Sequence, residues 1–262
     1  MDKNLPIFEV IDELADKLVR TKRVVLTAPP GAGKSTAIPI SLIKNPAFSE
    51  GKIIVLEPRR LAVKQVSLRM AQTLGEELGK TVGYRIRGEA KCSEKTKVEV
   101  VTEGILIRML QEDQQLTGVS TVIFDEFHER SLNADLGLAF CLEIASVLRN
   151  DLKILVMSAT LEIAAVSKLM QNAPTVSCEG KSFPVTPIWQ TKPVVQDQII
   201  GKLIINVILE AISENKGSIL VFLPGEREII KLASSLTNKV PDNCHVFPLY
   251  GRLNFKDQQK AI

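Results

Sequence analysis

The stretch 28–35 combines glycine, lysine and serine in a pattern that suits binding of a nucleotide's phosphates. Gly31 and Gly33 allow backbone N–H groups to converge on phosphate oxygens, and the N-terminus of a following helix adds partial positive charge. Lys34 can then reach the β- and γ-phosphates, and the hydroxyl of Ser35 can bind Mg²⁺. These residue types at this spacing predict a phosphate-binding loop.

The flanking segments support this interpretation of the loop. An apolar, β-branched run at 23–27 predicts a buried strand before it, and 36–43 predicts a helix after it, with a proline near the helix start. The full pattern begins with glycine, and Ala28 stands at that place here. The alternative is a plain glycine-rich turn, but the order strand, loop and helix favours a nucleotide site.

Two carboxylates follow another apolar strand, which is expected at 121–124. Asp125 is expected to bind Mg²⁺, usually through water, and so to complete the metal shell begun by Ser35. Glu126 could position and deprotonate the water that attacks the γ-phosphate. The alternative is that Asp125 caps a helix while Glu126 and His128 are solvated, and the phosphate-binding loop elsewhere in the chain makes that alternative less favourable.

The elements that must position these residues alternate between strands and helices. Because the strands are apolar throughout, they predict a parallel α/β sheet covered by helices on both faces. We expect strands at 23–27, 52–56, 81–87, 97–101, 121–124 and 153–157, and helices at 7–19, 36–43, 59–74, 104–111 and 133–149.

Five stretches whose side chains could bind ligands or take part in catalysis each follow one of these strands. Ligands of parallel sheets bind at the carboxyl ends of the strands, so one edge of the sheet should gather all five. The stretches are Gly31–Ser35, Arg59–Arg60, Thr102–Gly104, Asp125–His128 and Ser158–Thr160.

A change in composition near residue 180 predicts a domain boundary, because Gly180 and three prolines break any regular helix between 179 and 193. We therefore expect a first domain at 1–180 and the start of a second α/β domain at 181–262. In the second domain we expect helices at 196–215 and 226–236 and strands at 218–223 and 244–249. With only two convincing strands, this second domain is expected to be truncated.

Composition excludes several classes of protein. The 262 residues are 45% hydrophobic and 24% charged, as in ordinary soluble domains, and the net charge of +3 leaves nucleic-acid binding to a local basic groove. The four cysteines lie far apart and only two histidines occur, which argues against a disulfide framework and a zinc cluster. The sequence shows neither a signal peptide nor a bilayer-spanning run, so we expect a cytoplasmic protein without a membrane partner.

Taken together, the motifs resemble those of the DEAH/DExH group of superfamily 2 helicases. The matching stretches, in order, are Gly-Ala-Gly-Lys-Ser, Glu-Pro-Arg-Arg, Thr-Glu-Gly-Ile-Leu, Asp-Glu-Phe-His and Ser-Ala-Thr. The run from Asp125 to Asp135 is most similar to the bacterial HrpB-type branch, where phenylalanine replaces the alanine of Asp-Glu-Ala-His. The resemblance covers nearly the whole chain from Leu5 and is highly specific as a set.

This resemblance implies a RecA-like P-loop NTPase domain followed by part of a second RecA-like domain, which together couple hydrolysis of ATP with Mg²⁺ to movement along a single nucleic-acid strand, with RNA favoured. Arg59, Arg60 and Thr102 are expected to contact the strand's sugar–phosphate backbone, and Arg69 to stack on the nucleotide base. The implied nucleotide-binding residues are Gly31, Ala32, Gly33, Lys34, Ser35, Thr36 and Arg69, and the implied catalytic residues are Lys34, Asp125, Glu126 and His128.

The resemblance also assigns residues that link hydrolysis to movement. His128 is expected to connect the nucleotide site with the second domain, and Ser158 and Thr160 to couple hydrolysis to strand separation. The alternative for His128 is a surface histidine without a functional role. The alternative for Ser158 and Thr160 is that their hydroxyls cap the next helix. For Arg59 and Arg60 the alternative is a solvated helix start, although cations there oppose the helix dipole. For Arg69 the alternative, a solvated helical arginine, is at least equally favoured.

In the second domain, Leu223–Arg227 and Pro248–Gly251 resemble the family's early second-domain motifs. The arginine-rich motif that supplies a finger to the γ-phosphate is expected after Ile262, so these residues alone should hydrolyse ATP poorly. Two other functions stay open. One is a P-loop ATPase motor that does not unwind nucleic acid, and the other is a nucleotide-dependent nucleic-acid clamp without turnover.

Overall fold

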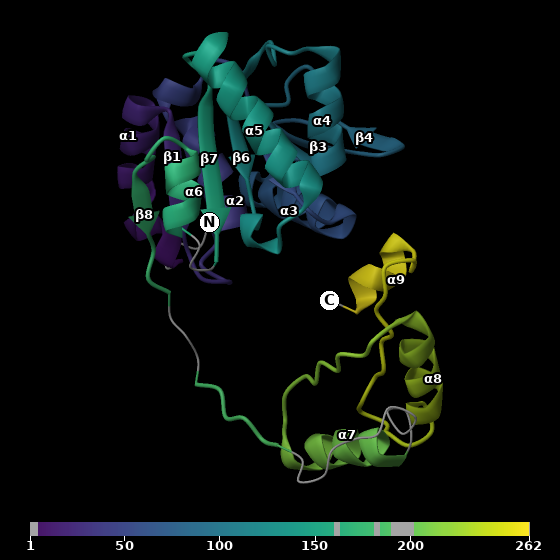
Figure 1. Cartoon of the computed structure of the whole chain (residues 1–262). Helices are drawn as coiled ribbons and strands as arrows, with labels where there is room; N and C mark the ends of the chain where they lie inside the picture. The colour runs from purple at the N-terminus through teal and green to yellow at the C-terminus, as the bar shows by residue number, and fades with distance from the viewer. Residues whose placement is uncertain (1–4, 160–162, 181–183, 190–201, 262) are drawn as a thin grey trace. The chain divides into compact units, whose positions relative to one another are not determined.

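The computed structural model describes residues 5–159, 163–180, 184–189 and 202–261. The chain divides into two compact units, Met1–Phe183 and Pro184–Ile262 (Figure 1). Each unit is described by itself below. Among the described residues, no helix has both the length and the apolar character needed to cross a bilayer.

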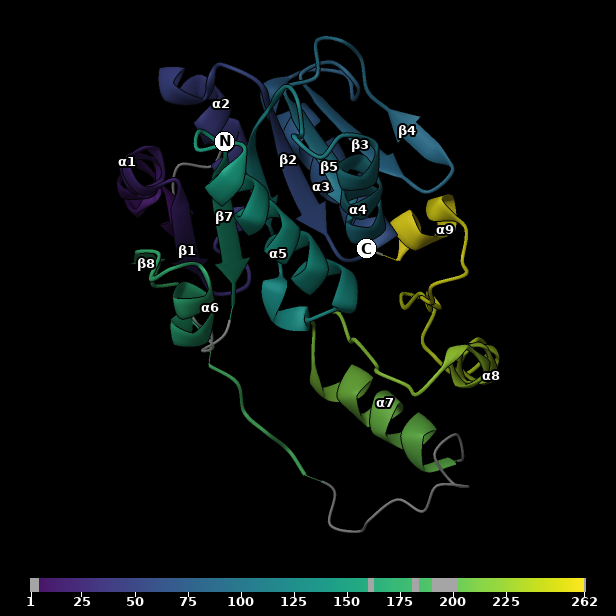
Figure 2. The ribbon, with the colours of Figure 1, turned by 45° about the horizontal axis from the view of Figure 1, so that its top comes forward.

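The first unit is built on one sheet, and its described residues form eight strands in the order β4-β3-β5-β2-β6-β7-β1-β8 (Figures 1 and 2). All neighbouring strands run parallel except the antiparallel pair β3 and β4. The strands are β1 (Arg23–Thr27), β2 (Lys52–Glu57), β3 (Val82–Ile86), β4 (Glu89–Lys91), β5 (Val98–Thr102), β6 (Val119–Phe124), β7 (Lys153–Ser158) and β8 (Thr175–Ser177). This confirms the predicted parallel α/β sheet.

Helices cover both faces of this sheet. In the first unit they are α1 (Ile11–Thr21), α2 (Lys34–Lys44), α3 (Arg60–Leu74), α4 (Glu103–Glu112), α5 (Leu132–Val147) and α6 (Ile163–Leu169), with short 3-10 turns η1 (Pro6–Glu9), η2 (Pro46–Phe48) and η3 (Phe127–Glu129). The strands alternate their side chains between two separate hydrophobic clusters, as the period of two in a strand requires.

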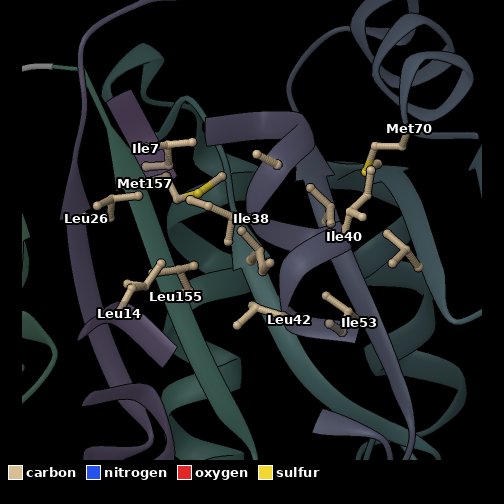
Figure 3. Close-up of a cluster of buried hydrophobic side chains, with 14 of the residues drawn as sticks. Ile7, Leu14, Leu26, Ile38, Ile40, Leu42, Ile53, Met70, Leu155 and Met157 are labelled. Carbon is tan, nitrogen blue, oxygen red and sulfur yellow. The ribbon is translucent and has the colours of Figure 1, made fainter. Parts of the chain in front are cut away.

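The cluster beneath α1, α2 and α3 lies close to the phosphate-binding loop. Leu26, Ile53, Leu155 and Met157 contribute to it from the sheet, and Ile38 with its neighbours on α2 packs against them (Figure 3). These side chains are buried from solvent. Burial of a large aliphatic side chain contributes about 1.5–3 kcal/mol, so this cluster holds α2 firmly against the sheet edge.

Three details of the first unit differ from expectation. The predicted helix at 7–19 is divided into η1 and α1. The backbone N–H of Ile7 donates a hydrogen bond to the carbonyl of Ala32 in the phosphate-binding loop. Helix α2 begins at Lys34, so Pro39 lies inside it and removes the N–H that would bond to the carbonyl of Ser35. Strands β4 and β8 were not expected, since three residues are too few for a period-two pattern to stand out.

The second unit contains helices α7 (Lys202–Glu214), α8 (Glu226–Leu236) and α9 (Phe255–Lys260). Ile205 and Ile208 of α7 pack with Leu232 and Leu236 of α8 in a small core. The predicted helix at 196–215 begins among residues outside the described ranges.

The strands predicted at 218–223 and 244–249 are wrong for this structure, because neither stretch carries a ladder of hydrogen bonds within the described residues. Phe222 and Leu220 are largely exposed. A strand is stable only when neighbours satisfy its backbone groups and cover its apolar face, and two short runs supply too few such partners.

Candidate active site

The phosphate-binding loop joins the end of β1 to the start of α2. Gly33 caps α2 with φ of 89°, and a Cβ there would lie 2.8 Å from Cδ1 of Leu5. Gly31 also has a positive φ of 80°, in open space. Both positions lie in the region that favours glycine, so the loop's course depends on these two residues. Ala28, where the full pattern has glycine, is buried and donates its N–H to the carbonyl of Ser158.

The acidic pair lies beside this loop. Strand β6 ends at Phe124, and the next two residues are Asp125 and Glu126. The Nζ atom of Lys34 lies 2.8 Å from Oε1 of Glu126, and Lys34 is only 4% exposed. The N–H of Glu126 donates to Oδ1 of Asp125 at 2.8 Å. The structure therefore brings Lys34, Asp125 and Glu126 together at one edge of the sheet.

Glu126 has a left-handed backbone conformation, with φ of 49°. Such a conformation costs a non-glycine residue about 1–2 kcal/mol, and it persists only where the surroundings enforce it. Here the bond to Asp125 and the ion pair with Lys34 fix the residue on both sides. The strained backbone turns the Glu126 carboxylate toward the phosphate-binding loop.

Asp125 is buried, and burial raises the pKa of its carboxyl group although a hydrogen bond with Ser35 and the charge of Lys34 oppose the rise. Its Oδ2 atom has no hydrogen-bond partner among the described residues. An unpartnered buried carboxylate oxygen beside a serine hydroxyl is chemically suited to a hard cation. The described residues include no cluster of three or more acidic, histidine or cysteine side chains that could hold a metal.

Glu57, the last residue of β2, is a member of the site that we did not predict. It is 3% exposed, and its Oε1 atom lacks a hydrogen-bond partner within the described part of the chain. Burial, together with the neighbouring charge of Asp125, raises the pKa of Glu57 to about 10. A carboxylate at the end of an apolar strand is the same signal that singled out Asp125, and it could have identified Glu57.

His128 touches both the acidic pair and the end of β7. Its Nδ1 atom lies 3.3 Å from Oε2 of Glu126 and 3.5 Å from the backbone nitrogen of Ala159. The Asp-Glu-Phe-His and Ser-Ala-Thr stretches are thus in contact through this imidazole. Ser158 is buried beside this contact, and Thr160 lies outside the described residues.

A groove of about 800 Å³ lies along the same edge of the sheet. It shares Pro58 and Glu103 with the small pocket that Asp125 and Glu126 line. Arg60, at the start of α3, and Thr102, at the end of β5, both line the groove. Their contact with a nucleic-acid strand stays a prediction. Thr102 caps α4 without using its side chain for the cap. The sequence had not singled out the groove's other arginines, Arg85, Arg87 and Arg108.

Arg59 and Arg69 lie in different surroundings. Nη2 of Arg59 is 2.9 Å from Oε1 of Glu129, so an ion pair connects the start of α3 to the segment after the acidic pair. Arg69 is exposed on α3, nine residues after Arg60, which places it about 13 Å further along the helix. The stacking of Arg69 on a nucleotide base stays a prediction.

A parallel sheet with a phosphate-binding loop after β1 and an acidic pair after β6 defines a P-loop nucleoside-triphosphatase domain of the RecA-like class. The comparisons with known proteins identify the family. A family model described as "DEAD/DEAH box helicase" matches residues 9–169. The chain belongs to this family, which confirms the family resemblance inferred from the motifs.

Individual relatives agree with this assignment. The ATP-dependent RNA helicase HrpB of Escherichia coli is 45% identical over 99% of this chain, and the match covers 32% of HrpB. The ATP-dependent RNA helicase HrpA of Borreliella burgdorferi is 38% identical over 100% of this chain and is covered to 32%. The similarity to HrpB confirms the predicted branch. The chain thus spans about a third of the length of these relatives.

A solved structure extends the comparison to the fold. The crystal structure of the Escherichia coli DEAH/RHA helicase HrpB matches with a TM-score of 0.87 and 44% identity, and the match covers 99% of this chain and 33% of that one. At this level of identity, the RecA-like architecture of the sheet is established together with the family.

Proposed function

We propose that this chain forms the nucleotide-binding part of an ATP-dependent helicase that moves along a single strand of RNA. The observation that carries the proposal is the convergence of Lys34, Asp125 and Glu126 beside the phosphate-binding loop, in a chain of the DEAD/DEAH box helicase family. The relatives named as ATP-dependent RNA helicases favour RNA over DNA.

Mg²⁺ is the metal that the site fits best. Ser35 and Asp125 would hold it, since the Oδ2 atom of Asp125 is buried without a protein partner and hydroxyl and carboxylate oxygens are suited to this ion. When bound with ATP, the ion neutralises negative charge on the phosphates. The protein would contribute only Ser35 and Asp125, the latter usually through water, in keeping with the reliance of Mg²⁺ on phosphate oxygens and water.

The remaining chemistry belongs to the chain's own side chains. Gly31, Ala32, Gly33 and Thr36 surround the phosphates with backbone N–H groups, and Lys34 binds the β- and γ-phosphates. Glu126 orients the attacking water and accepts its proton. His128 contacts Glu126 and Ala159, and it therefore transmits the state of the nucleotide to the Ser158–Thr160 stretch.

The groove beside the acidic pair is the proposed path of the RNA. Arg60 and Thr102 would bind the sugar–phosphate backbone, and Arg87 adds a further cation on the groove wall. Arg59 would join them when its ion pair with Glu129 opens. Contacts of this type do not depend on base sequence, and they weaken as salt concentration rises.

The two units would divide this work. We propose residues 1–180 as the ATP-binding RecA-like domain and 181–262 as the start of a second RecA-like domain, whose Leu223–Arg227 and Pro248–Gly251 stretches would face the nucleic acid. The four cysteines are free thiols, which suits a reducing compartment such as the cytoplasm.

The decisive experiment is an ATPase assay of the full-length protein without nucleic acid, with single-stranded RNA and with single-stranded DNA. We expect stimulation by RNA and loss of activity in K34A, with K44A at the opposite end of α2 as the matched control. ATP turnover that neither RNA nor DNA stimulates would instead support the P-loop ATPase motor that does not unwind nucleic acid. Nucleotide-dependent RNA binding without any turnover would support the clamp.

A further inference from the structure

Strands β3 and β4 form a hairpin at one edge of the sheet, with β4 as the outermost strand (Figure 2). All three residues of β4 are exposed, so little apolar packing holds this strand. Six consecutive hairpin residues, 85–90, nevertheless line the groove proposed for RNA. Arg87 and Gly88 form the two-residue turn at its tip. Tyr84 and Ile86 anchor β3 in the core, so contacts made by β4 itself decide how the tip is held relative to α3.

Glu89, the first residue of β4, provides such contacts. Its Oε2 atom lies 2.6 Å from Nζ of Lys64, and its Oε1 atom accepts a hydrogen bond from the hydroxyl of Tyr84 on β3. The ammonium of Lys64 also lies 5.9 Å from the centroid of the Tyr84 ring, within the range of a cation–π contact. Lys64 follows Arg60 by one turn of α3. One carboxylate thus connects the two elements that carry Arg60 and Arg87.

The protonation states suit these contacts at neutral pH. Burial, with the hydrogen bond to Glu89 as the next cause, raises the pKa of Tyr84 to about 12, so its hydroxyl keeps the proton that it donates. The hydrogen bonds from Lys64 and Tyr84 lower the pKa of Glu89, so its carboxylate stays charged. A negative charge in a groove for phosphates would repel the ligand, and such a charge is useful there only if it serves another purpose.

We propose that Glu89, held by Lys64 and Tyr84, is a positioning residue that fixes the β3–β4 hairpin against α3, so that Arg87 and Arg60 bind phosphates of the same RNA strand. This inference rests on the RNA-binding groove of the proposed function. It assigns Glu89 no contact with RNA. The repulsion between the Glu89 carboxylate and RNA is offset because Arg60 and Arg87 are held at a fixed distance from each other.

The test uses the sign of one effect. Removal of a carboxylate from a phosphate-binding groove strengthens RNA binding if only charge matters, whereas loss of a positioning residue weakens it. We expect E89Q to bind a fluorescent single-stranded RNA of roughly 12 nucleotides about fivefold to tenfold more weakly than the unaltered chain, as measured by anisotropy. E13Q is the matched control, because Glu13 forms a similar 2.6 Å ion pair with Lys17 on α1.

A double-mutant cycle with R87A separates positioning from a general loss of structure. We expect R87A to weaken binding in the unaltered chain and to have less effect in the E89Q chain, while binding of an ATP analogue stays unchanged in both. Equal or tighter RNA binding by E89Q, or full additivity with R87A, would overturn the positioning role. If R60A also leaves RNA binding unaffected, the groove itself is misassigned, and the proposed function fails with it.

Discussion

The ammonium of Lys34 lies 2.8 Å from a carboxylate oxygen of Glu126, so the two side chains proposed to act on the γ-phosphate form an ion pair with each other. The side chain of Lys34 is shielded from water at 4% exposed, and that of Glu126 is partly exposed at 27%. We propose that a nucleotide bound at the loop draws Lys34 toward its phosphates. In this proposal the movement frees Glu126 to receive a water molecule, so that the base becomes available only when the substrate is present.

The first prediction concerns E126Q. Glutamine keeps the shape of the side chain but cannot accept a proton, so we expect turnover of the full-length protein to fall by about 10²- to 10⁴-fold. ATP should bind at least as tightly as before, because the variant no longer competes for Lys34 with a charge. Phosphate release and binding of a fluorescent ATP analogue measure the two effects, with E143Q on the exposed side of α5 as the control. Unchanged turnover would remove Glu126 from the role of base.

The second prediction concerns the pH dependence of stability at Glu57. Its pKa is raised from an ordinary value of 4.5 to about 10 in the folded protein, so between these values the unfolded chain releases a proton that the folded protein keeps. The free energy of unfolding therefore falls as pH rises through this window, by at most ~1.4 kcal/mol per pH unit for one proton.

The variant E57Q has no proton to release at this position on unfolding. We expect E57Q to gain stability relative to the unaltered chain as the pH rises from about 6 to about 9, because the amide needs no proton to stay neutral. Urea unfolding without nucleotide and with a chelator measures the difference. Parallel pH profiles of the two chains would show that Glu57 is not held protonated.

The third prediction compares the two members of a buried ion pair. Glu99 on β5 has a side chain 2% exposed, and its Oε1 lies 2.8 Å from Nε of Arg85 on β3, which is 43% exposed. R85A leaves a buried carboxylate whose remaining ion-pair partner, among the residues that the structure describes, is Lys52 at 3.9 Å, so we expect a loss of about 3 kcal/mol. E99Q leaves Arg85 able to reach water and should cost less, about 1 kcal/mol.

Chemical denaturation of both variants tests this order. R108A serves as the comparison for R85A, because Arg108 pairs with Glu112 at the same distance of 2.8 Å but both side chains are exposed. It should change stability by less than about 1 kcal/mol. A greater loss in E99Q than in R85A would contradict the argument from burial.

The fourth prediction uses the two glycines of the phosphate-binding loop. G33A places a Cβ 2.8 Å from Leu5 at a positive φ, whereas G31A adds a Cβ in open space. We expect G31A to cost about 1 kcal/mol of backbone strain, and G33A to cost more and to weaken ATP binding as the loop shifts. Thermal unfolding and nucleotide titration check both. Equal effects of the two substitutions would show that the contact with Leu5 does not matter.

The strands and the residues that follow them were largely predictable from the sequence. The apolar runs ending at Thr27 and Phe124 carry their functional residues at the next positions, and parallel pairing alone brings these to one edge. Glu57 carries the same local signal as Asp125, a carboxylate at the end of an apolar strand. What the sequence does not show is its proximity to Asp125, which is distant in sequence and comes close only through the pairing of β2 with β6. The β3–β4 hairpin was missed because β4 has no apolar pattern of its own.

The second unit shows the converse. Residues 218–223 have the composition of a buried strand, but composition indicates only a preference for burial, and Leu220 and Phe222 are largely exposed in this structure. Whether a ladder forms depends on neighbouring strands, which no property of the six residues themselves can indicate. Local preference therefore predicted well in the first unit, where eight strands pair in one described sheet, and failed in the second unit, where the described residues form no sheet.

Strand β1 lies between β7 and β8, so its hydrogen-bonding partners come from late in the first unit; Arg23, for example, pairs with Ile154. On a ribosome that adds ~5–20 residues per second, roughly 130 residues must be made before that partner exists, a delay of roughly 7 to 26 seconds. During this interval an apolar strand and the loop that follows it emerge without their native neighbours. Nascent chains of this protein are thus expected to depend on chaperones, and the ATP site to be the last part of the first unit to mature.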